Sequence, residues 1–366
     1  MRLTNSGLKL DVYGESHGEF IGMTLSGVPL GESVDGELLQ EFVDRRRAGG
    51  GVFSTTRREP DKIIILSGIE GGITTGGVIE ARINNTQMRS KDYDNLKNTP
   101  RPSHADYPAF VKYGGKLNMS GGGKFSGRLT APLCIAGGIA AQILSRHGIT
   151  VGAYIAEIGG IKGASYRERD INADDLIRLK GMRFPVLDDN SGEKMLDAIA
   201  AAKGDLDSLG GIVEGVAVGV PAGWGDAMYG SIESALSSLL FGIPAIKGVE
   251  FGAGFDITRM RGSEANDPYY YDANGNVKTK SNNNGGILGG ITNGMPVLFR
   301  AAVKPTPSIS KPQDTVDLAK KTNTQIVIKG RHDVCIVPRA AIAIEAALAL
   351  TLLDALYSQE GASKNE

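Results

Sequence analysis

Short runs rich in valine and isoleucine recur along the chain and predict β-strands. Each run is bounded by glycine or proline, a combination that is typical of strands ending in turns. The runs cover residues 62–66, 78–83, 212–220 and 296–303.

Apolar residues also recur at helical spacing. Between residues 226 and 241, positions 232, 235, 236, 239 and 240 are apolar, which is the pattern of one helix face. We predict further helices over 34–47 and 133–146; the first begins with acidic residues and ends with three arginines, a polarity that suits the helix dipole. The most apolar stretch, 340–356, carries Glu345 and Asp354 and is therefore predicted to be a buried core helix, not a membrane span.

Two motifs occur twice, in the same order. GVPLG at 27–31 and GVPAG at 219–223 each precede a predicted helix, whereas GIEGGITTG at 68–76 and GILGGITNG at 286–294 each precede a predicted strand. Chance similarity among glycine turns is the alternative, but the shared order favours a duplicated α+β unit. We expect a single domain over 1–366, with intertwined pseudo-repeats at about 8–150 and 205–357, because no linker separates the halves.

Composition narrows the function classes. A formal net charge of −1 and a pI of about 6.5 give no basic field for nucleic acid or a membrane surface. The two cysteines have no paired spacing, and no HxH, HExxH or CxxC pattern occurs, so we expect a reducing compartment and no metal site. The N-terminal residues lack an apolar segment, so we expect no signal peptide and a cytoplasmic protein.

Three of the four histidines lie in polar, glycine-rich or arginine-rich runs. His17 lies in GESHG, His104 in RPSHAD and His332 in GRHD, each within a few residues of a carboxylate. Imidazole is the side chain most easily tuned to transfer protons near neutral pH. Any one of them could be an ordinary loop residue, but three together predict a proton-transfer site for an anionic substrate. The fourth, His147, precedes Gly148 at a predicted helix end and is interpreted as structural.

Arginines and glycines surround these histidines. Five arginines flank the turn between residues 45 and 58, and a second glycine loop, SGGGKFSGRLT, spans 120–130. Arginine binds carboxylate and phosphate bidentately, and glycine lets backbone amides approach an anion. A solvated helix end is the alternative for the first segment. A third segment, Lys304 to Ser308, is as compatible with a plain connector as with a binding loop.

Together these motifs resemble the chorismate synthase family over nearly the whole chain. The resemblance rests on seven segments in family order, at 14–18, 44–47, 57–61, 101–106, 121–123, 304–306 and 330–333. It implies an α+β fold, a duplicated intertwined β-α-β sandwich with helices covered by antiparallel sheets, and a homotetramer. It also implies a carbon–oxygen lyase that eliminates phosphate from 5-enolpyruvylshikimate 3-phosphate in a 1,4-anti sense, giving chorismate with no net redox change. Reduced FMN (FMNH2) is the implied cofactor, with NADPH as a possible reductant and a separate flavin reductase as a probable partner.

The resemblance also implies roles for individual residues. His17 would protonate the departing phosphate, His104 would lie beside the flavin, and Asp333, Ser16 and Ser126 would form a proton relay. The implied substrate-binding residues are Arg46, Arg101 and Arg339, and Arg46 is also the implied NADP contact. The implied flavin contacts are Lys124, Phe125, Ser126, Pro244, Ala245, Gly289, Lys304, Pro305, Thr306, Pro307, Ser308 and Arg331.

The chain departs from the family pattern at several loop positions. Ser103 stands where a glycine usually precedes the histidine, and Phe125, Pro244 and Val334 also differ from the usual residues. A flavin-binding redox or regulatory module without lyase activity is therefore the alternative function. A sugar-phosphate kinase is a weaker alternative, because the sequence has no Walker lysine motif.

Overall fold

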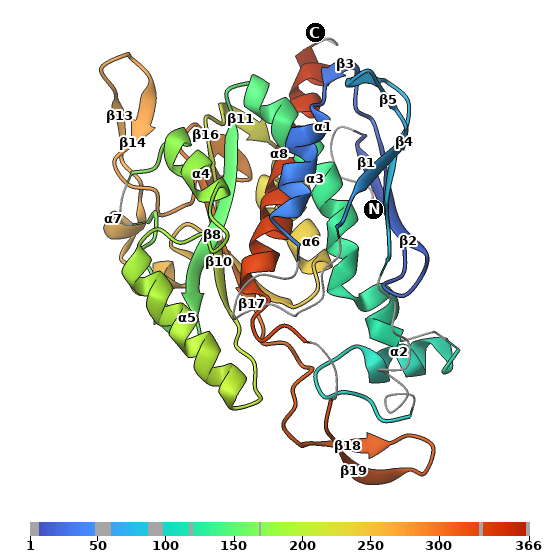
Figure 1. The fold of residues 1–366 in the computed structure, drawn as a ribbon. Helices are drawn as coiled ribbons and strands as arrows, with labels where there is room; N and C mark the ends of the chain where they lie inside the picture. The colour runs from blue at the N-terminus through green and yellow to red at the C-terminus, as the bar shows by residue number, and fades with distance from the viewer. Residues whose placement is uncertain are drawn as a thin grey trace.

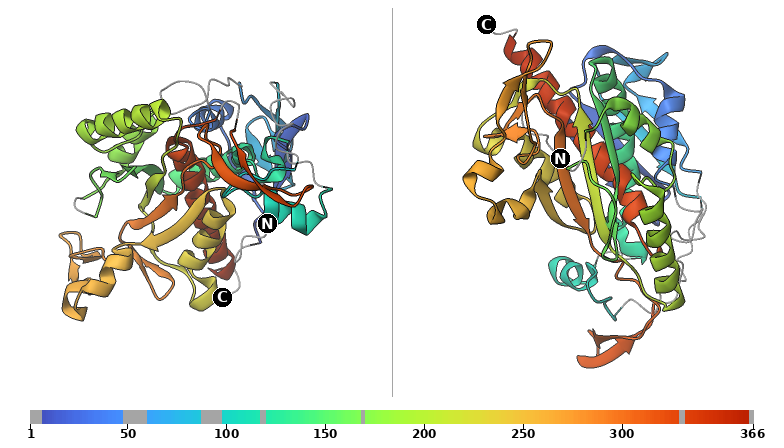
Figure 2. Two further views of the ribbon diagram at one scale, coloured as in Figure 1. Left: turned by 90° about the horizontal axis from the view of Figure 1, so that it is seen from below. Right: turned by 90° about the vertical axis from the view of Figure 1, so that its left-hand side faces the viewer.

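Two long helices lie between two larger antiparallel sheets and form the centre of the molecule (Figures 1 and 2). The computed structural model describes residues 7–47, 60–86, 98–116, 120–167, 170–328 and 332–363. The helices are α1 (Gly36–Asp44), α2 (Asp106–Tyr113), α3 (Thr130–Arg146), α4 (Ala173–Lys180), α5 (Asp189–Gly204), α6 (Ile232–Gly242), α7 (Gly262–Ala265) and α8 (Val337–Ser363).

The two larger sheets repeat one strand arrangement. The first sheet has the order β1 (Lys9–Gly14), β2 (Phe20–Ser26), β7 (Ile79–Asn84), β4 (Ile63–Ser67). The second has the order β9 (Ile161–Lys162), β8 (Thr150–Ile158), β10 (Gly211–Val218), β17 (Val297–Val303), β12 (Ile246–Phe251). Apart from the short edge strand β9, each sheet places its strands in the chain order first, second, last, third. The fold is therefore α+β, a duplicated β-α-β sandwich.

The short strands also form two sheets that repeat one arrangement, with the strands in the chain order first, last, second. One three-stranded sheet has the order β3 (Leu30–Ser33), β6 (Ile73–Thr75), β5 (Ile69–Glu70), and its counterpart has the order β11 (Ala222–Gly225), β16 (Ile291–Asn293), β15 (Ile287–Leu288). Two hairpins project from the body, β13 (Tyr269–Tyr271) with β14 (Val277–Thr279) and β18 (Gln313–Asp317) with β19 (Thr322–Ile326) (Figure 1).

The predicted elements are all present with small shifts in their ends. The four predicted strands are β4, β7, β10 and β17, and the four predicted helices are α1, α3, α6 and α8. Helix α8 is apolar on nearly every side, and 94% of its most apolar window is buried between the sheets, which confirms the prediction of a core helix. Helix α3 lies beside it and also has the length and composition of a membrane span, with 67% of its window buried. The C-cap of α3 is His147, as predicted for a structural histidine.

Helix α1 carries residues that matter below, and local contacts fix its position. Its N-cap Asp35 accepts hydrogen bonds from the backbone of Glu37 and Leu38 at 2.8 and 3.0 Å. Gln142, near the end of α3, accepts from the Asp35 N–H at 2.8 Å and donates to the Asp35 carbonyl oxygen at 3.0 Å. Arg46, just after α1, donates to Thr130 at the start of α3, so the C-terminal end of α1 lies next to the N-terminal end of α3.

Candidate active site

A cavity of about 610 Å³ opens where four helix ends meet. Its walls come from the C-terminal ends of α1 and α6, the N-terminal ends of α3 and α8, and the loops at 101–105 and 304–308. The volume lies within the range of roughly 300–1,000 Å³ that is usual for small-molecule sites.

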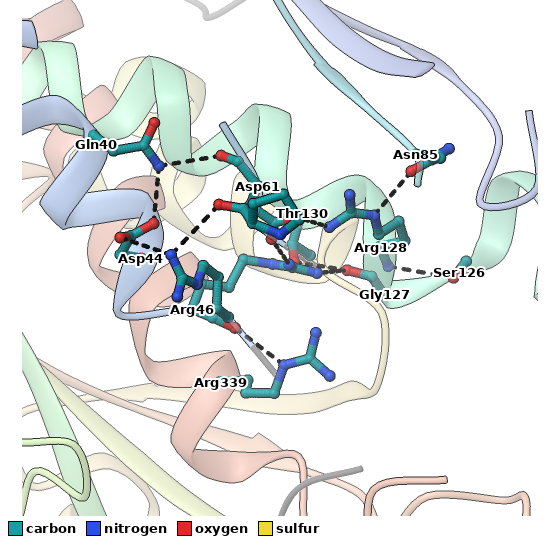
Figure 3. A network of polar contacts seen from close by, with 12 residues as sticks. Gln40, Asp44, Arg46, Asp61, Asn85, Ser126, Gly127, Arg128, Thr130 and Arg339 are labelled. Atoms are coloured by element: carbon teal, nitrogen blue, oxygen red, sulfur yellow. Dashed lines mark hydrogen bonds and ion pairs between the residues drawn. The ribbon is translucent and has the colours of Figure 1, made fainter. Parts of the chain in front are cut away.

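Arg46 forms one wall of the cavity and is only 2% exposed. Its Nε donates to Oγ1 of Thr130 at 2.7 Å, and its Nη2 donates to the carbonyl oxygen of Gly127 at 2.6 Å (Figure 3). Nη1 lies 3.6 Å from a carboxylate oxygen of Asp61. Burial, together with the neighbouring Arg339 guanidinium, lowers the pKa of Arg46 to about 10. Arg46 is thus rigidly held and still cationic at neutral pH.

Asp61 and Arg128 form a second buried pair beside Arg46. Nη1 of Arg128 donates to Asp61, and Gln40 of α1 donates to the Asp61 carbonyl oxygen at 3.1 Å (Figure 3). Nε of Arg128 donates to Asn85 at 3.2 Å, and the backbone N–H of Arg128 donates to Oγ of Ser126 at 3.2 Å. These contacts fix the start of α3 relative to the first sheet.

Asn85 connects this cluster to the histidine loop between β1 and β2. Its side-chain nitrogen donates to the carbonyl oxygens of Glu15 and Gly18, at 3.1 and 2.7 Å. Within that loop, Oγ of the buried Ser16 lies 3.1 Å from Nδ1 of His17. The loop is therefore coupled to the cavity through Asn85 and Arg128, although neither Ser16 nor His17 lines the cavity.

The first turn of α8 adds another charged group. Arg339 donates from Nη1 to Asp333 and from Nε to the carbonyl oxygen of Arg46 at 3.1 Å (Figure 3). His332 precedes Asp333 and also lines the cavity. The N-terminal end of α8 thus clamps the C-terminal end of α1.

A tight turn presents Arg101 and His104 to the cavity. The His104 N–H donates to the Arg101 carbonyl oxygen at 3.3 Å, Pro102 is the second residue, and Ser103 has a φ of 58°. These are features of a type II turn, whose third position favours glycine because φ is positive there. Both side chains bind Asp106, the first residue of α2.

Lys304 connects this turn to the opposite wall. Its Nζ donates to the Ser103 carbonyl oxygen, and its N–H donates to the Ala245 carbonyl oxygen at 3.0 Å. Ala245 also has a positive φ, of 78°. Burial, and to a smaller extent the charge of Lys247, lowers the pKa of Lys304. Lys304 thus binds the carbonyl oxygens of Ser103 and Ala245, two cavity residues with positive φ. Strained backbone of this kind is often found at functional sites.

Lys124 follows the three glycines of the loop at 120–130 and contacts the aromatic side chain of Tyr113. Nζ of Lys124 donates to the hydroxyl of Tyr113 at 2.6 Å and lies 4.0 Å from the Tyr113 ring centroid. This hydrogen bond lowers the pKa of Tyr113. Phe125 follows along the same wall of the cavity.

The structure brings together most of the residues that the sequence nominated. The predicted site residues that line the cavity are Arg46, Arg101, His104, Lys124, Phe125, Ser126, Pro244, Ala245, Lys304, Thr306, Pro307, Ser308, Asp333 and Arg339. Pro305 is not part of the lining, and Gly289 lies in the β15–β16 turn near the start of α6, away from the end of α6 that borders the cavity. Arg331 and the arginine- and glycine-rich segment 48–59 lie outside the described residues.

Sequence reasoning missed several groups that the fold places here. Asp61 and Arg128 line the cavity, and Asp106 lies behind it. All three stand inside motifs that drew attention to their segments, but no role was assigned to them. The partners of Asp61 and Arg128 are distant in sequence, so the motifs alone did not signal their contacts. His332 was nominated with the other loop histidines, and it lines the cavity.

Comparison with known proteins agrees with this geometry. The family model for chorismate synthase matches residues 8–357. Chorismate synthase of Korarchaeum cryptofilum is 45% identical over 347 residues, covering 95% of both chains, and that of Pyrococcus abyssi is 46% identical over 349 residues, covering 95% of this chain and 96% of the relative. A crystal structure of chorismate synthase superposes with a TM-score of 0.75 at 28% identity, covering 96% of this chain and 92% of the other. The chain belongs to the chorismate synthase family.

Proposed function

We propose that the cavity binds 5-enolpyruvylshikimate 3-phosphate beside reduced FMN, with the residues described above in contact with both. By its family the protein is a chorismate synthase, a carbon–oxygen lyase that eliminates phosphate from this small-molecule substrate and uses a reduced flavin. Nothing in the comparisons favours a flavin-binding module without lyase activity.

The charge of the cavity wall is the observation that carries the substrate proposal. The substrate has two carboxylates and a phosphate, so it brings about three to four negative charges to be offset by arginine and lysine. Among the described residues, six cations and two carboxylates line the cavity: Arg46, Arg101, Lys124, Arg128, Lys304 and Arg339 against Asp61 and Asp333.

Two buried polar atoms support a further ligand. Oγ1 of Thr306 is buried without a hydrogen-bond partner among the described residues, and Nη1 of Arg46 is buried with only the ion-pair contact to Asp61 at 3.6 Å and no hydrogen bond. Burying such groups is unfavourable unless a partner arrives, so both fit a site that a ligand completes. Lys304, Thr306 and Ser308 would hold the anionic end of the flavin, with Phe125 and Ala245 beside its ring system. When bound, reduced flavin supplies electron density as the carbon–oxygen bond breaks and recovers it afterwards, so no net redox change results.

The histidines would move the protons. His17 would protonate the leaving phosphate from the loop that Asn85 connects to Arg128, and His104 would hold a proton next to the flavin. Asp333, Ser16 and Ser126 would relay protons between them. His17 does not line the cavity, so in this proposal the substrate phosphate would have to approach the β1–β2 loop.

Other parts of the proposal concern the location and assembly of the protein, the source of its reduced flavin and its domain organisation. We place the protein in the cytoplasm as a homotetramer that receives reduced FMN from a separate reductase, with NADPH binding at Arg46 as an internal alternative. The whole chain would be one domain of two pseudo-repeats. Because β8 occupies the place of β1, we propose that the second unit starts at β8, with residues 159–210 as an insertion.

The test compares two variants, each measured for its affinity for the substrate and for FMN. Arg46→Lys keeps the charge but removes the planar fork, so the KM for the substrate should rise about tenfold or more while the Kd for FMN changes little. Lys304→Met should weaken FMN binding and leave substrate affinity less affected. Arg178→Lys, outside the cavity, is the control. Equal effects of both variants on both ligands would contradict the division of the cavity into two subsites.

A further inference from the structure

Among the described residues, Asp106 makes four hydrogen bonds to two partners, Arg101 and His104, and both of them line the cavity. Its Oδ2 accepts from the backbone N–H and from Nε of Arg101, at 3.0 and 2.7 Å. Its Oδ1 accepts from Nη2 of Arg101 at 2.8 Å and lies 2.7 Å from Nδ1 of His104. Asp106 itself is 8% exposed and is not part of the cavity lining.

The Asp106 carboxylate is held in its charged form. Burial alone would raise its pKa, but the hydrogen bonds from Arg101 and His104 outweigh burial and keep the pKa well below the ordinary value. Its place at the N-terminus of α2 acts in the same direction, because a helix N-terminus favours negative charge. Asp106 is therefore a permanent acceptor at any working pH.

This acceptor decides which nitrogen of His104 carries a proton. An ionised carboxylate can only accept, and a guanidinium can only donate. Nη2 of Arg101 also lies 3.0 Å from Nδ1 of His104, but an unprotonated Nδ1 would place its lone pair against an acceptor oxygen only 2.7 Å away. Nδ1 must therefore carry the hydrogen that points to Oδ1. The Nε2 edge of the ring then faces the glycine loop, where a Cβ on Gly122 would lie 3.5 Å from Nε2.

We propose that Asp106 is a positioning residue that fixes the tautomer and orientation of His104 and aims Arg101 into the cavity. The inference rests on the proposed roles of His104 and Arg101 in this site. A carboxylate that binds one nitrogen of a functional histidine sets the state of the other nitrogen in the same way in many enzymes.

Other charges also face His104, and the test must separate them from Asp106. Arg101 belongs to the same turn, Lys304 reaches the turn through the Ser103 carbonyl oxygen, and Lys124 lines the same cavity from the glycine loop. All three are cations that can only donate, so none of them can accept the Nδ1 hydrogen. Asp106 is the carboxylate in direct contact with the ring.

The experiment measures the state of His104 directly, in protein without added flavin. Histidine labelled with ¹³C and ¹⁵N gives four sets of ring signals, because the chain has four histidines, and His104→Gln assigns the one of interest. The wild type should show the Nδ1–H tautomer. In Asp106→Asn the tautomers should mix, because the neutral amide no longer offers only an acceptor to Nδ1.

The same variant should also lose activity. The kcat should fall roughly 10–100-fold, the range for carboxylates that orient a functional group, because His104 no longer holds one tautomer. Asp106→Glu keeps the carboxylate acceptor and should keep the Nδ1–H tautomer of His104. It also serves as the second variant if Asp106→Asn does not fold.

Asp267→Asn is a closely matched control. Asp267 is 9% exposed and also accepts four hydrogen bonds, from Ser281, Asn283 and Asn284, but it lies outside the cavity. It should cost comparable stability without moving the His104 signals or kcat. The proposal is overturned if Asp106→Asn leaves the tautomer of His104 unchanged, if Asp267→Asn changes that tautomer equally, or if Asp106→Glu loses as much activity as Asp106→Asn. The wild-type ring signals test the pairing even if the protein shows no elimination activity.

Discussion

Breaking the ion pair between Arg45 and Glu345 from one side should strongly destabilise the helix core. Glu345 is fully buried in the middle of α8, and its two oxygens accept from Nη1 and Nη2 of Arg45 at 3.1 and 2.7 Å. Lys180 of α4 lies 3.9 Å from the same carboxylate. Although burial alone lowers the pKa of Arg45, the charge and hydrogen bonds of Glu345 outweigh it and raise that pKa.

Glu345→Gln removes the negative charge and keeps the shape. It leaves Arg45 buried without a counter-ion, and breaking such a pair typically costs about 3–5 kcal/mol. An unfolding entropy of about 2.1 cal/mol/K per residue gives about 0.8 kcal/mol/K for 366 residues. Calorimetry should therefore show a Tm lower by about 4–6 °C.

Two controls sharpen this test. Asp44→Asn breaks the neighbouring Arg47–Asp44 pair, in which both side chains are more than a third exposed, and should cost less than about 1 kcal/mol. Replacing both Arg45 and Glu345 by methionine removes both buried charges and should recover much of the loss. The reasoning is refuted if Glu345→Gln lowers the Tm no more than Asp44→Asn, or if the double variant is the least stable of all.

Three further predictions concern single sites. His17→Ala should lower turnover by about 10²–10⁴-fold and spare flavin binding, measured by steady-state kinetics and titration, and unchanged turnover would remove His17 from the mechanism. Ser103→Gly should raise the free energy of unfolding in urea by roughly 0.5–1 kcal/mol, because it relieves a left-handed φ, and a decrease would show that the serine side chain compensates for its strain. Burial raises the pKa values of Cys134 and Cys335 to about 12. The stability that the protonated thiols contribute is therefore fully present below the ordinary thiol pKa and is lost as the pH rises from there toward 12. At pH 8 both thiols should react with a disulfide reagent slowly in the native protein and quickly in guanidinium, and fast native labelling would contradict their burial.

The sequence predicted the main elements because their signals are local. Strands β4, β7, β10 and β17 and helices α1, α3, α6 and α8 each have a complete apolar pattern in one stretch of chain. The region of α4 and α5 was not predicted. Helix α5 starts at Asp189 and runs to Gly204 with alternating small, polar and charged residues, so its apolar face is short and its pattern weak.

The candidate site depends on contacts that no local pattern reveals. Arg45 and Arg47 resemble the end of a solvated helix, and that interpretation holds for Arg47, which is paired at the surface. Arg45 instead pairs with a carboxylate 300 residues away in α8, and Arg46 lines the cavity. Asp106 illustrates the same limit, since only the folded turn brings Arg101 and His104 to one carboxylate.

The most direct test of the central claim is product formation from 5-enolpyruvylshikimate 3-phosphate under anaerobic conditions with chemically reduced FMN. Oxidised FMN and omission of the protein are the controls. The account predicts phosphate and chorismate in equal amounts, and only with reduced flavin. Tight flavin binding without either product would contradict it and would favour a binding module instead.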